Sequence, residues 1–514
     1  MTLPAADFSH AIPQSLDYVR ILPELVLSAF GILVMLLDPF VDEEKSQKTL
    51  GFIAFAGTIA ALVATWYTTK FPGFAFSNNI RIDTFSAFFI FLVIAIAAVV
   101  ILSSFEYMAV QRIRAGEYYA LILFSVVGMV VMSSAVELVL IFIGLEISSI
   151  STYILAGFRR HSASSSESSL KYFLLGSFAT AFFLYGVAMM FGATGSTNID
   201  TISRTLQSGP AQVLVFVAMA LMFVGLGFKV AAAPFHVWTP DVYEGAPAPI
   251  VGFMSTAPKA AAFAVLLRVV FSINAPGRFW FLWVAAALSM TLGNIEALVQ
   301  TNVKRLLAYS SIAHAGYLLV AFAMTTPENS LNGISAAMFY TAAYAAMNVG
   351  AFAVVSHFAN AGEKYVTLED YEGLGRTSPL LAATLTMFLL SLIGIPITGG
   401  FFAKFYVFSA ALRANLIWLT LIGVVNSAIG AYYYLRIIVM MYMREAREQV
   451  PVTPVPFSMT VALCVSVLAT LYLGMLPNRV LRVAQQSAQQ LVSQPSTAPS
   501  NIAQTPQPEG VPEQ

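Results

Sequence analysis

The most constraining feature of the sequence is an overlong apolar segment, 211–238, that contains Lys229 and Pro234. It is about eight residues longer than the ~20 that cross a bilayer as one helix. Proline removes a backbone donor and clashes with the preceding turn, so the pattern predicts a transmembrane helix broken just after Lys229. Broken membrane helices are typical of transport sites. Lys229 is a candidate functional residue, in preference to a lysine that extends to the interface, because apolar sequence flanks it on both sides.

The composition places this segment in a membrane protein. Of the 514 residues, 58% are apolar and only 10% are charged, which excludes a soluble protein and predicts an all-α polytopic membrane protein. The 26 basic and 26 acidic residues balance, so nothing indicates a nucleic-acid partner. The single cysteine, Cys464, excludes a disulfide framework and a cysteine-ligated cluster, so no redox centre is expected on this chain.

Apolar runs of about 18–25 residues predict fourteen membrane spans, of which the seventh and the twelfth are broken. Beyond the last span, the Pro-, Ser- and Gln-rich segment 478–514 is expected to be a disordered tail. The spans are expected near 19–38, 49–69, 83–104, 118–134, 136–157, 170–192, 211–238, 249–271, 279–300, 303–325, 332–358, 378–412, 416–442 and 456–476.

The twelfth span is a second overlong run, in which GIPITGG interrupts the apolar sequence and Lys404 follows. The two interrupted spans lie five spans apart, which suggests two structural repeats of five helices. Because each repeat has an odd number of helices, the second must enter the membrane from the opposite face, so the repeats are expected to be inverted. The expected division is 1–117 for helices 1–3, 118–271 for the first repeat, 279–442 for the second, and 456–476 for helix 14.

The fifth span carries two glutamates at different depths. Glu137 opens the span and Glu146 follows nine residues later, which places it about 13.5 Å deeper at 1.5 Å per residue. The two side chains also face opposite ways around the helix. Glu146 is therefore expected to be functional and Glu137 to be interfacial.

Other spans add polar candidates. Lys259 is central in span 8 beside Pro258, and His314 is central in span 10, where a core histidine with satisfied hydrogen bonds is an equal alternative. His236 follows the break in span 7, and a structural role is slightly preferred for it. Lys304 and Arg305 begin span 10, where basic residues normally hold the inner interface. That role is preferred for Arg305, and Lys304 is a supporting candidate for the path.

Tyr344 and Asn348 in span 11 can order water but cannot carry charge at neutral pH. Buried unpaired charges are costly, so the membrane-depth residues are expected to converge on a hydrated interior path. A lysine on such a path can carry a proton, because apolar surroundings disfavour the ammonium whereas a nearby carboxylate such as Glu146 favours it. A mild excess of basic residues in alternate loops predicts that both termini lie outside the cytoplasm.

Four strings of the sequence resemble the antiporter-like membrane subunits of respiratory complex I, and most closely the subunit N branch of that family. This resemblance covers about 137–442 and implies a pair of inverted five-helix repeats, with Glu146, Lys229, Lys259, His314 and Lys404 at matching positions of the proton path. Span 11 lacks the histidine of some relatives, so transfer there is expected to use water near Tyr344 and Asn348. The strings are FVGLGFKVAAAPFHVWTPDVYEGAPAP, TNVKRLLAYSSIAHAGYLLVA, SLIGIPITGGFFAKFYVF and SAIGAYYYLRIIVMMY.

The resemblance implies that quinone reduction elsewhere in the assembly drives proton transfer through two linked half-channels of this subunit. Flavin, iron–sulfur clusters and quinone are then expected on partner subunits. The expected partners are other membrane-arm subunits, including the antiporter-like subunit M and small subunits such as K, together with membrane lipid. The expected location is the bacterial inner membrane, with both termini on the periplasmic side.

Two alternatives to a proton-pumping subunit remain open on the sequence. One is a subunit of a multisubunit sodium/proton antiporter, which uses an ion gradient and no redox partner. The other is a structural spacer whose buried charges only stabilise the membrane arm. Sodium transport is expected to require further membrane-embedded carboxylates as hard oxygen ligands, and Glu146 is the one central carboxylate in the predicted spans.

Overall fold

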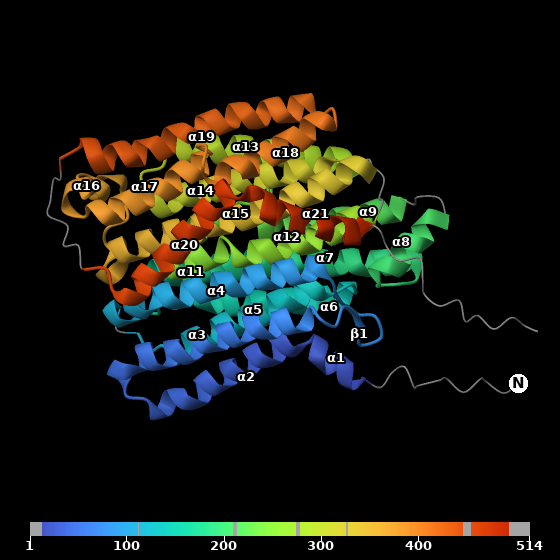
Figure 1. The fold of residues 1–514 in the computed structure, drawn as a ribbon, viewed down its shortest axis with the longest axis horizontal. Coiled ribbons are helices and arrows are strands. Elements are labelled where there is room, and N and C mark those ends of the chain that lie inside the picture. The colour runs from blue at the N-terminus through green and yellow to red at the C-terminus, as the bar shows by residue number, and fades with distance from the viewer. Residues whose placement is uncertain are drawn as a thin grey trace, which may run out of the picture.

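The computed structural model describes residues 13–111, 113–208, 213–273, 278–324, 327–445 and 454–492. Long helices run side by side, with α2 and α3 along one edge of the bundle and α19 along the opposite edge (Figure 1). Helix α1, strand β1 and the short helix α8 gather at one end, and α16 lies at the other (Figure 1). These two ends are the predicted outer and inner faces.

The N-terminal part packs α4 into the interior of the bundle. Helix α4 is buried over most of its length and contacts α3, α5, α12, α15, α20 and α21. An antiparallel hairpin precedes it, with Gly73 opposite Ile82. The elements are α1 (Ser15–Arg20), α2 (Leu22–Leu37), η2 (Asp38–Phe40), α3 (Glu43–Thr68), β1 (Gly73–Ala75), β2 (Ile80–Ile82) and α4 (Thr84–Val110).

The predicted first repeat contains the break that the sequence indicates. Helix α9 ends at Val230, and Ala231 adopts a left-handed conformation with φ 59° before a stretch of turns leads to α10. The prediction of a break just after Lys229 is confirmed. The elements are α5 (Gly116–Ser134), α6 (Leu138–Ala156), α7 (Ala163–Thr194), α8 (Ile199–Ser208), α9 (Val213–Val230), α10 (Thr239–Gly245), α11 (Ala248–Met254) and α12 (Ala257–Ser272).

The predicted second repeat breaks at 394–398, as its glycines and proline indicate. Gly394 has φ +95°, and a Cβ at Gly400 would lie 1.8 Å from the Ser391 carbonyl oxygen, so only glycine allows the two half-helices to approach. The elements are α13 (Arg278–Leu298), α14 (Val303–Val320), η3 (Ala321–Ala323), α15 (Pro327–Ala359), η4 (Ala361–Glu363), η5 (Leu368–Tyr371), α16 (Leu374–Thr377), α17 (Pro379–Ile393), α18 (Gly399–Arg413) and α19 (Ile417–Met443).

The span count agrees with the prediction once the twelfth span is treated as two half-helices. Within the described residues, 13 spans are long and apolar enough to cross a membrane, and α17 with α18 supplies the remaining one. The eighth span differs from the prediction of one continuous helix. It divides into α11 and α12 at Ser255 and Thr256, immediately before Pro258, whose ring cannot fit the interior of a helix.

The prediction of a disordered tail over 478–514 is wrong for its first part. After α20 (Phe457–Met475), residues Pro477–Val492 form the amphipathic helix α21, which packs on α15 and α4. The Gln490 side chain accepts hydrogen bonds from Thr84, and the Gln490 carbonyl accepts one from Arg81. The polar composition predicted disorder, but the apolar residues of α21 recur with helical period and pack against α15 and α4. Residues 493–514 lie outside the described part of the chain.

Candidate functional site

The buried cations that the sequence singles out lie beside breaks in the helices. Lys229 is in the last turn of α9, Lys259 in the first turn of α12 and Lys404 in the second turn of α18, and all three side chains are buried. For Lys404 the position has a direct reason, because an interrupted helix leaves backbone carbonyls without intrahelical partners and the ammonium donates to two of them.

Lys229 lies in an aromatic cage. Its Nζ is 3.4 Å from the Tyr172 hydroxyl and lies over the rings of Tyr172 and Tyr153, 5.4 and 5.5 Å from their centroids. Trp238 stacks on Tyr172 at 4.4 Å and donates a hydrogen bond to the Phe228 carbonyl, which the break of α9 frees. Cation–π contacts stabilise the ammonium while it stays without a direct counter-ion.

Glu146 is half-buried on α6, on the outward side of the bundle near the exposed side chains of Ile143 and Ile147. It interacts electrostatically with Lys229, but no ion pair joins the two among the described residues. One of its carboxylate oxygens is buried without a hydrogen-bond partner. Glu137, in contrast, caps the N-terminus of α6 by accepting from the backbone of Val139 and Leu140. Glu137 thus lies at the start of α6 and Glu146 in its middle, and the functional role of Glu146 stays a prediction.

Lys259 begins a line of hydrogen bonds that reaches Tyr344. Its Nζ donates to the Ser311 hydroxyl at 2.6 Å, and the Tyr344 hydroxyl donates to the same oxygen at 2.7 Å. Asn348, one turn along α15, donates to Ser255 at the break between α11 and α12. Tyr344 is therefore in the line of contacts, whereas Asn348 braces the adjacent helix break.

His314 lies beside the Tyr344 end of this line. Its Nδ1 is 2.7 Å from the Tyr340 hydroxyl and its Nε2 is 3.2 Å from the Tyr434 hydroxyl, while its ring lies 5.1 Å from the ring of Tyr344. It interacts electrostatically with both Lys259 and Lys404. The side chain is thus a fully hydrogen-bonded core histidine and a neighbour of two buried lysines, so the two alternatives for His314 are compatible.

Lys404 on α18 hydrogen-bonds to the end of α17 across the break of the twelfth span. Its Nζ donates to the carbonyls of Leu392 and Ile393 at 3.1 and 2.9 Å and to the Ser427 hydroxyl at 2.8 Å. It also lies 5.0 Å from the centroid of the Tyr317 ring. The ammonium therefore caps α17 and connects it to α19.

His236 lies apart from the line of contacts. It is half-buried, its Nδ1 has no hydrogen-bond partner, and its electrostatic neighbour is Glu296 on α13. The structure gives it neither a lysine partner nor a place in the polar line, which agrees with the slight preference for a structural role.

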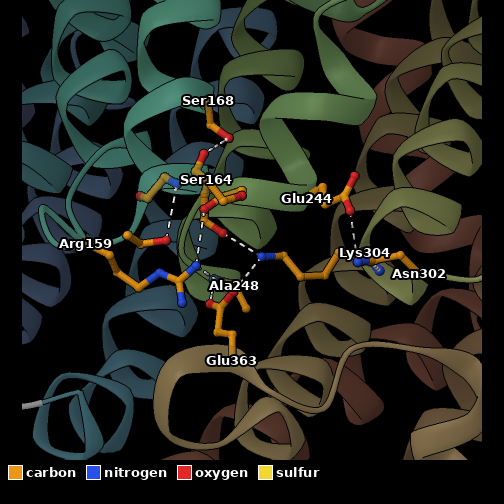
Figure 2. Close-up of polar contacts among 12 residues, drawn as sticks. Arg159, Ser164, Ser168, Glu244, Ala248, Asn302, Lys304 and Glu363 are labelled. Carbon is orange, nitrogen blue, oxygen red and sulfur yellow. Dashed lines mark hydrogen bonds and ion pairs between the residues drawn. The ribbon is translucent and has the colours of Figure 1, made fainter.

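Lys304 lies in a buried ion cluster at the inner face instead of at an exposed interface. Its Nζ contacts Glu363 at 2.7 Å and the Ala246 carbonyl at 2.6 Å. Glu363 also lies 3.4 Å from Arg159 and accepts from the Ala248 backbone at 2.7 Å, and Figure 2 shows it between the two cations. Lys304 is wholly buried and needs an anion there, and its supporting role in the path stays a prediction.

Burial raises the pKa of Glu363, but the positive charges of Lys304 and Arg159 and the hydrogen bonds from Lys304 and Ala248 lower it more, so the carboxyl stays below its ordinary value. Tyr107 of α4 donates a further hydrogen bond to it at 2.8 Å. The cluster thus joins the N-terminal helices and both predicted repeats. Sequence reasoning missed Glu363, because the loop AGEKY carries no helical or apolar pattern.

A second ion-pair array lies beside this cluster and is more exposed. Arg305 contacts both Asp241 and Glu244 at 2.8 Å, and Asp241 also contacts Lys171 at 2.8 Å. The lysine and arginine beside this carboxylate, through hydrogen bonds and charge, hold the pKa of Asp241 below its usual range despite partial burial. This array fixes the inner end of α10 to α7 and α14.

Comparisons with known proteins agree with this geometry. The sequence profile described as "NADH:quinone oxidoreductase/Mrp antiporter, TM" matches residues 135–430. NADH-quinone oxidoreductase subunit N 2 of Koribacter versatilis is 65% identical over 95% of this chain and 100% of that protein. The chain belongs to the NADH-quinone oxidoreductase subunit N family. Subunit N 1 of Solibacter usitatus is 49% identical, over 92% of this chain and 98% of its own.

Solved structures extend the family comparison to three dimensions. A chain of respiratory complex I from Thermus thermophilus with bound aureothin has a TM-score of 0.76 and 37% identity, covering 90% of this chain and 99% of that chain. A chain of the Mrp complex from Dietzia has a TM-score of 0.78 but only 20% identity, covering 93% and 98%. Because its sequence identity is low, the comparison with the Mrp chain shows only that the two chains share a fold. The all-α membrane fold predicted for this subunit N family member is confirmed.

Proposed function

We propose that this chain translocates protons as a non-redox subunit in the membrane arm of an NADH:quinone oxidoreductase. The observation that carries the proposal is the hydrogen-bonded line from Lys259 through Ser311 to Tyr344, whose ring lies beside that of His314. Lysine, hydroxyl and imidazole groups can all exchange protons. Membership of the subunit N family supports the assembly in which this transfer would take place.

The first step concerns Lys229 and Glu146. They interact electrostatically without forming an ion pair in the described structure. A movement that shortens their separation favours the ammonium, and a movement that lengthens it favours release of the proton. Quinone reduction elsewhere in the complex would change this separation. The buried lysines would then load and unload protons through two linked half-channels.

The arrangement favours protons over sodium ions. Sodium needs several oxygen ligands that are free to coordinate it. The carbonyl and hydroxyl oxygens at the break of the twelfth span already accept hydrogen bonds from Lys404. Glu146 is the one carboxylate at central depth in the described spans. A subunit of a sodium/proton antiporter is therefore the less favoured candidate.

The proposal assigns redox cofactors to other subunits. The single cysteine, Cys464, is exposed, so this chain offers no set of thiolates for an iron–sulfur cluster. Flavin, clusters and quinone would be bound by partner subunits. The partners in the membrane would be the other subunits of complex I, among them subunit M, small subunits such as K, and lipid, with no nucleic acid.

The proposed location is the bacterial inner membrane with both termini on the periplasmic side. Arg159, Arg160, Lys171, Lys304 and Arg305 lie at one end of the bundle. By the positive-inside rule, this end faces the cytoplasm. The end that carries α1, β1 and α8 then faces the periplasm (Figure 1).

Replacing Lys229 with alanine in the assembled complex tests the proposed function. NADH-driven proton pumping and coupled quinone reduction should fall by about 10- to 100-fold, up to the lower end of what a positioned acid–base group contributes, because a buried proton carrier is lost. NADH oxidation by an artificial acceptor at the peripheral arm should stay unchanged. Pumping is measured as acidification of inverted membrane vesicles with a pH-sensitive dye.

The matched control is Lys70→Ala. Lys70 is exposed and lies over the ring of Trp66, so its loss should leave pumping unchanged. A normal ratio of protons to electrons in Lys229→Ala would favour the structural spacer and contradict the proposed function.

A further inference from the structure

The buried polar groups fall into two sets with a gap between them. One set is Lys229 with Tyr172. The other set starts with Lys259, Ser311 and Tyr344 and leads to His314. Among the hydrogen bonds of the described residues, none joins the two sets. A proton that moves from Lys229 to Lys259 therefore needs a further group between them.

Tyr243 of α10 occupies the position between the two sets. Its side chain is fully buried. On one side its ring packs edge-on against Trp238, with centroids 6.0 Å apart, and Trp238 stacks on Tyr172 of the first set. Its electrostatic neighbours are Tyr172 of the first set and Tyr344 of the second, and its hydrogen-bonding neighbour is Ser311 of the second. Tyr243 is thus adjacent to both sets.

The hydroxyl of Tyr243 makes no hydrogen bond of standard geometry among the described residues, although the Ser311 side chain lies within its reach. A buried hydroxyl without a partner is unfavourable, so native structures retain one where a water, an ion or a moving group completes the contact. The neighbours Tyr172 and Ser311 already hydrogen-bond to Lys229 and Lys259. The groups that could hydrogen-bond to the Tyr243 hydroxyl, Tyr172 and Ser311, are therefore themselves members of the two sets.

We propose that the Tyr243 hydroxyl relays protons between the Lys229 set and the Lys259 set, with one ordered water or a small side-chain rotation completing the contacts. This inference rests on the proposed function. A hydroxyl both donates and accepts a hydrogen bond. Lys229 gives a proton to the Tyr172 hydroxyl, whose own proton passes to the Tyr243 oxygen. The Tyr243 proton leaves to Ser311 Oγ, and the Ser311 proton passes to the neutral amine of Lys259. Each tyrosine is neutral before and after the transfer.

The test is Tyr243→Phe in the assembled complex. This change keeps the ring packed on Trp238 and Phe352 and removes only the hydroxyl. We expect pumping and coupled quinone reduction to fall about three- to tenfold, the loss that one hydrogen-bonding group produces. The ratio of rates in H2O and D2O should rise above that of the parent, because proton transfer across the gap becomes rate-limiting.

The matched control is Tyr371→Phe. Tyr371 is also a fully buried tyrosine whose hydroxyl lacks a hydrogen-bond partner, but it packs on Phe358 at the inner face, 4.3 Å between centroids. Its variant should pump like the parent and show the parent's isotope ratio. If Tyr243→Phe lowers the yield of the complex, the isotope ratio of the assembled fraction still decides.

The outcomes separate this inference from the proposed function. Normal pumping by Lys229→Ala would overturn both. Impaired pumping by Lys229→Ala with a parental rate and isotope ratio in Tyr243→Phe would overturn the relay alone. Equal losses in Tyr243→Phe and Tyr371→Phe, with unchanged isotope ratios, would assign both tyrosines to packing and would also overturn the relay.

Discussion

Replacing Glu363 with glutamine should destabilise the chain by about 3–5 kcal/mol, the usual cost of removing one partner of a buried ion pair. Glutamine has nearly the same shape and can still accept from Tyr107 and Ala248, which now bond to the carboxylate. It leaves Lys304, wholly buried, and Arg159 without their anion. The measurement is the temperature at which this chain dissociates from the detergent-solubilised complex.

The control for this prediction is Glu117→Gln. Glu117 pairs with Arg160 at 2.7 Å, closer than Glu363 is to Arg159, but both side chains are mostly exposed. Exposed pairs contribute about 0–1 kcal/mol, so this variant should dissociate at nearly the parental temperature. Equal shifts in the two variants would contradict the view that Glu363 is the anion on which the inner-face cluster depends.

The parent and the Glu363→Gln variant also give a test of pH dependence. Because the pKa of Glu363 is lowered in the folded chain, its ion pairs contribute fully above its unfolded value of about 4.3. The contribution is lost as the pH falls through the lowered folded value. The difference in dissociation temperature between the parent and Glu363→Gln should stay constant from neutral pH to about 4.3 and narrow below it.

Replacing Lys404 with alanine should slow proton pumping by about a hundredfold, the lower end of what a positioned acid–base group contributes. The effect should exceed that of Lys229→Ala because Lys404 has two roles. It is a buried proton carrier, and it donates to the carbonyls of Leu392 and Ile393, which the helix break leaves without intrahelical partners. Among the described residues, Lys229 contacts a tyrosine hydroxyl and aromatic rings but donates to no backbone carbonyl.

Two further variants separate these roles of Lys404. Arginine can still donate to the two carbonyls but cannot release its proton, so Lys404→Arg should keep the complex assembled and remain deficient in pumping. Lys404→Glu can exchange protons and should retain part of the function. Pumping by the arginine variant at the parental rate would mean that Lys404 only caps the helix, and the proton path would then need another carrier.

Several features of this chain follow from local sequence. The break after Lys229 and the break before Lys404 could be predicted because proline and glycine act on the backbone of their own helix. The depth of Glu146 could be predicted because the rise of a helix is constant. The break at Ser255 was missed, although Pro258 signals it, because continuous apolar sequence on both sides gave the pattern of one span.

The partners of the buried groups could not be predicted in the same way. Tyr434 and His314 are 120 residues apart, and Lys304 and Glu363 are 59 apart. Burial makes a partner necessary for each polar group, but many serines, tyrosines and carbonyls could have supplied it. The contact between distant helices decides which one does.

The sequence by itself determined that this is a membrane protein, how many spans it has, where two of them break and which residues carry charge at depth. These are properties of apolar length, backbone geometry and the high cost of charge in lipid, all of which act within one segment. Only the tertiary structure decided that Ser311 joins Lys259 to Tyr344, that Glu363 neutralises Lys304, and that α21 packs on the bundle. Each of these depends on which helix faces meet, because the interactions are short-ranged and the partners are far apart in the chain.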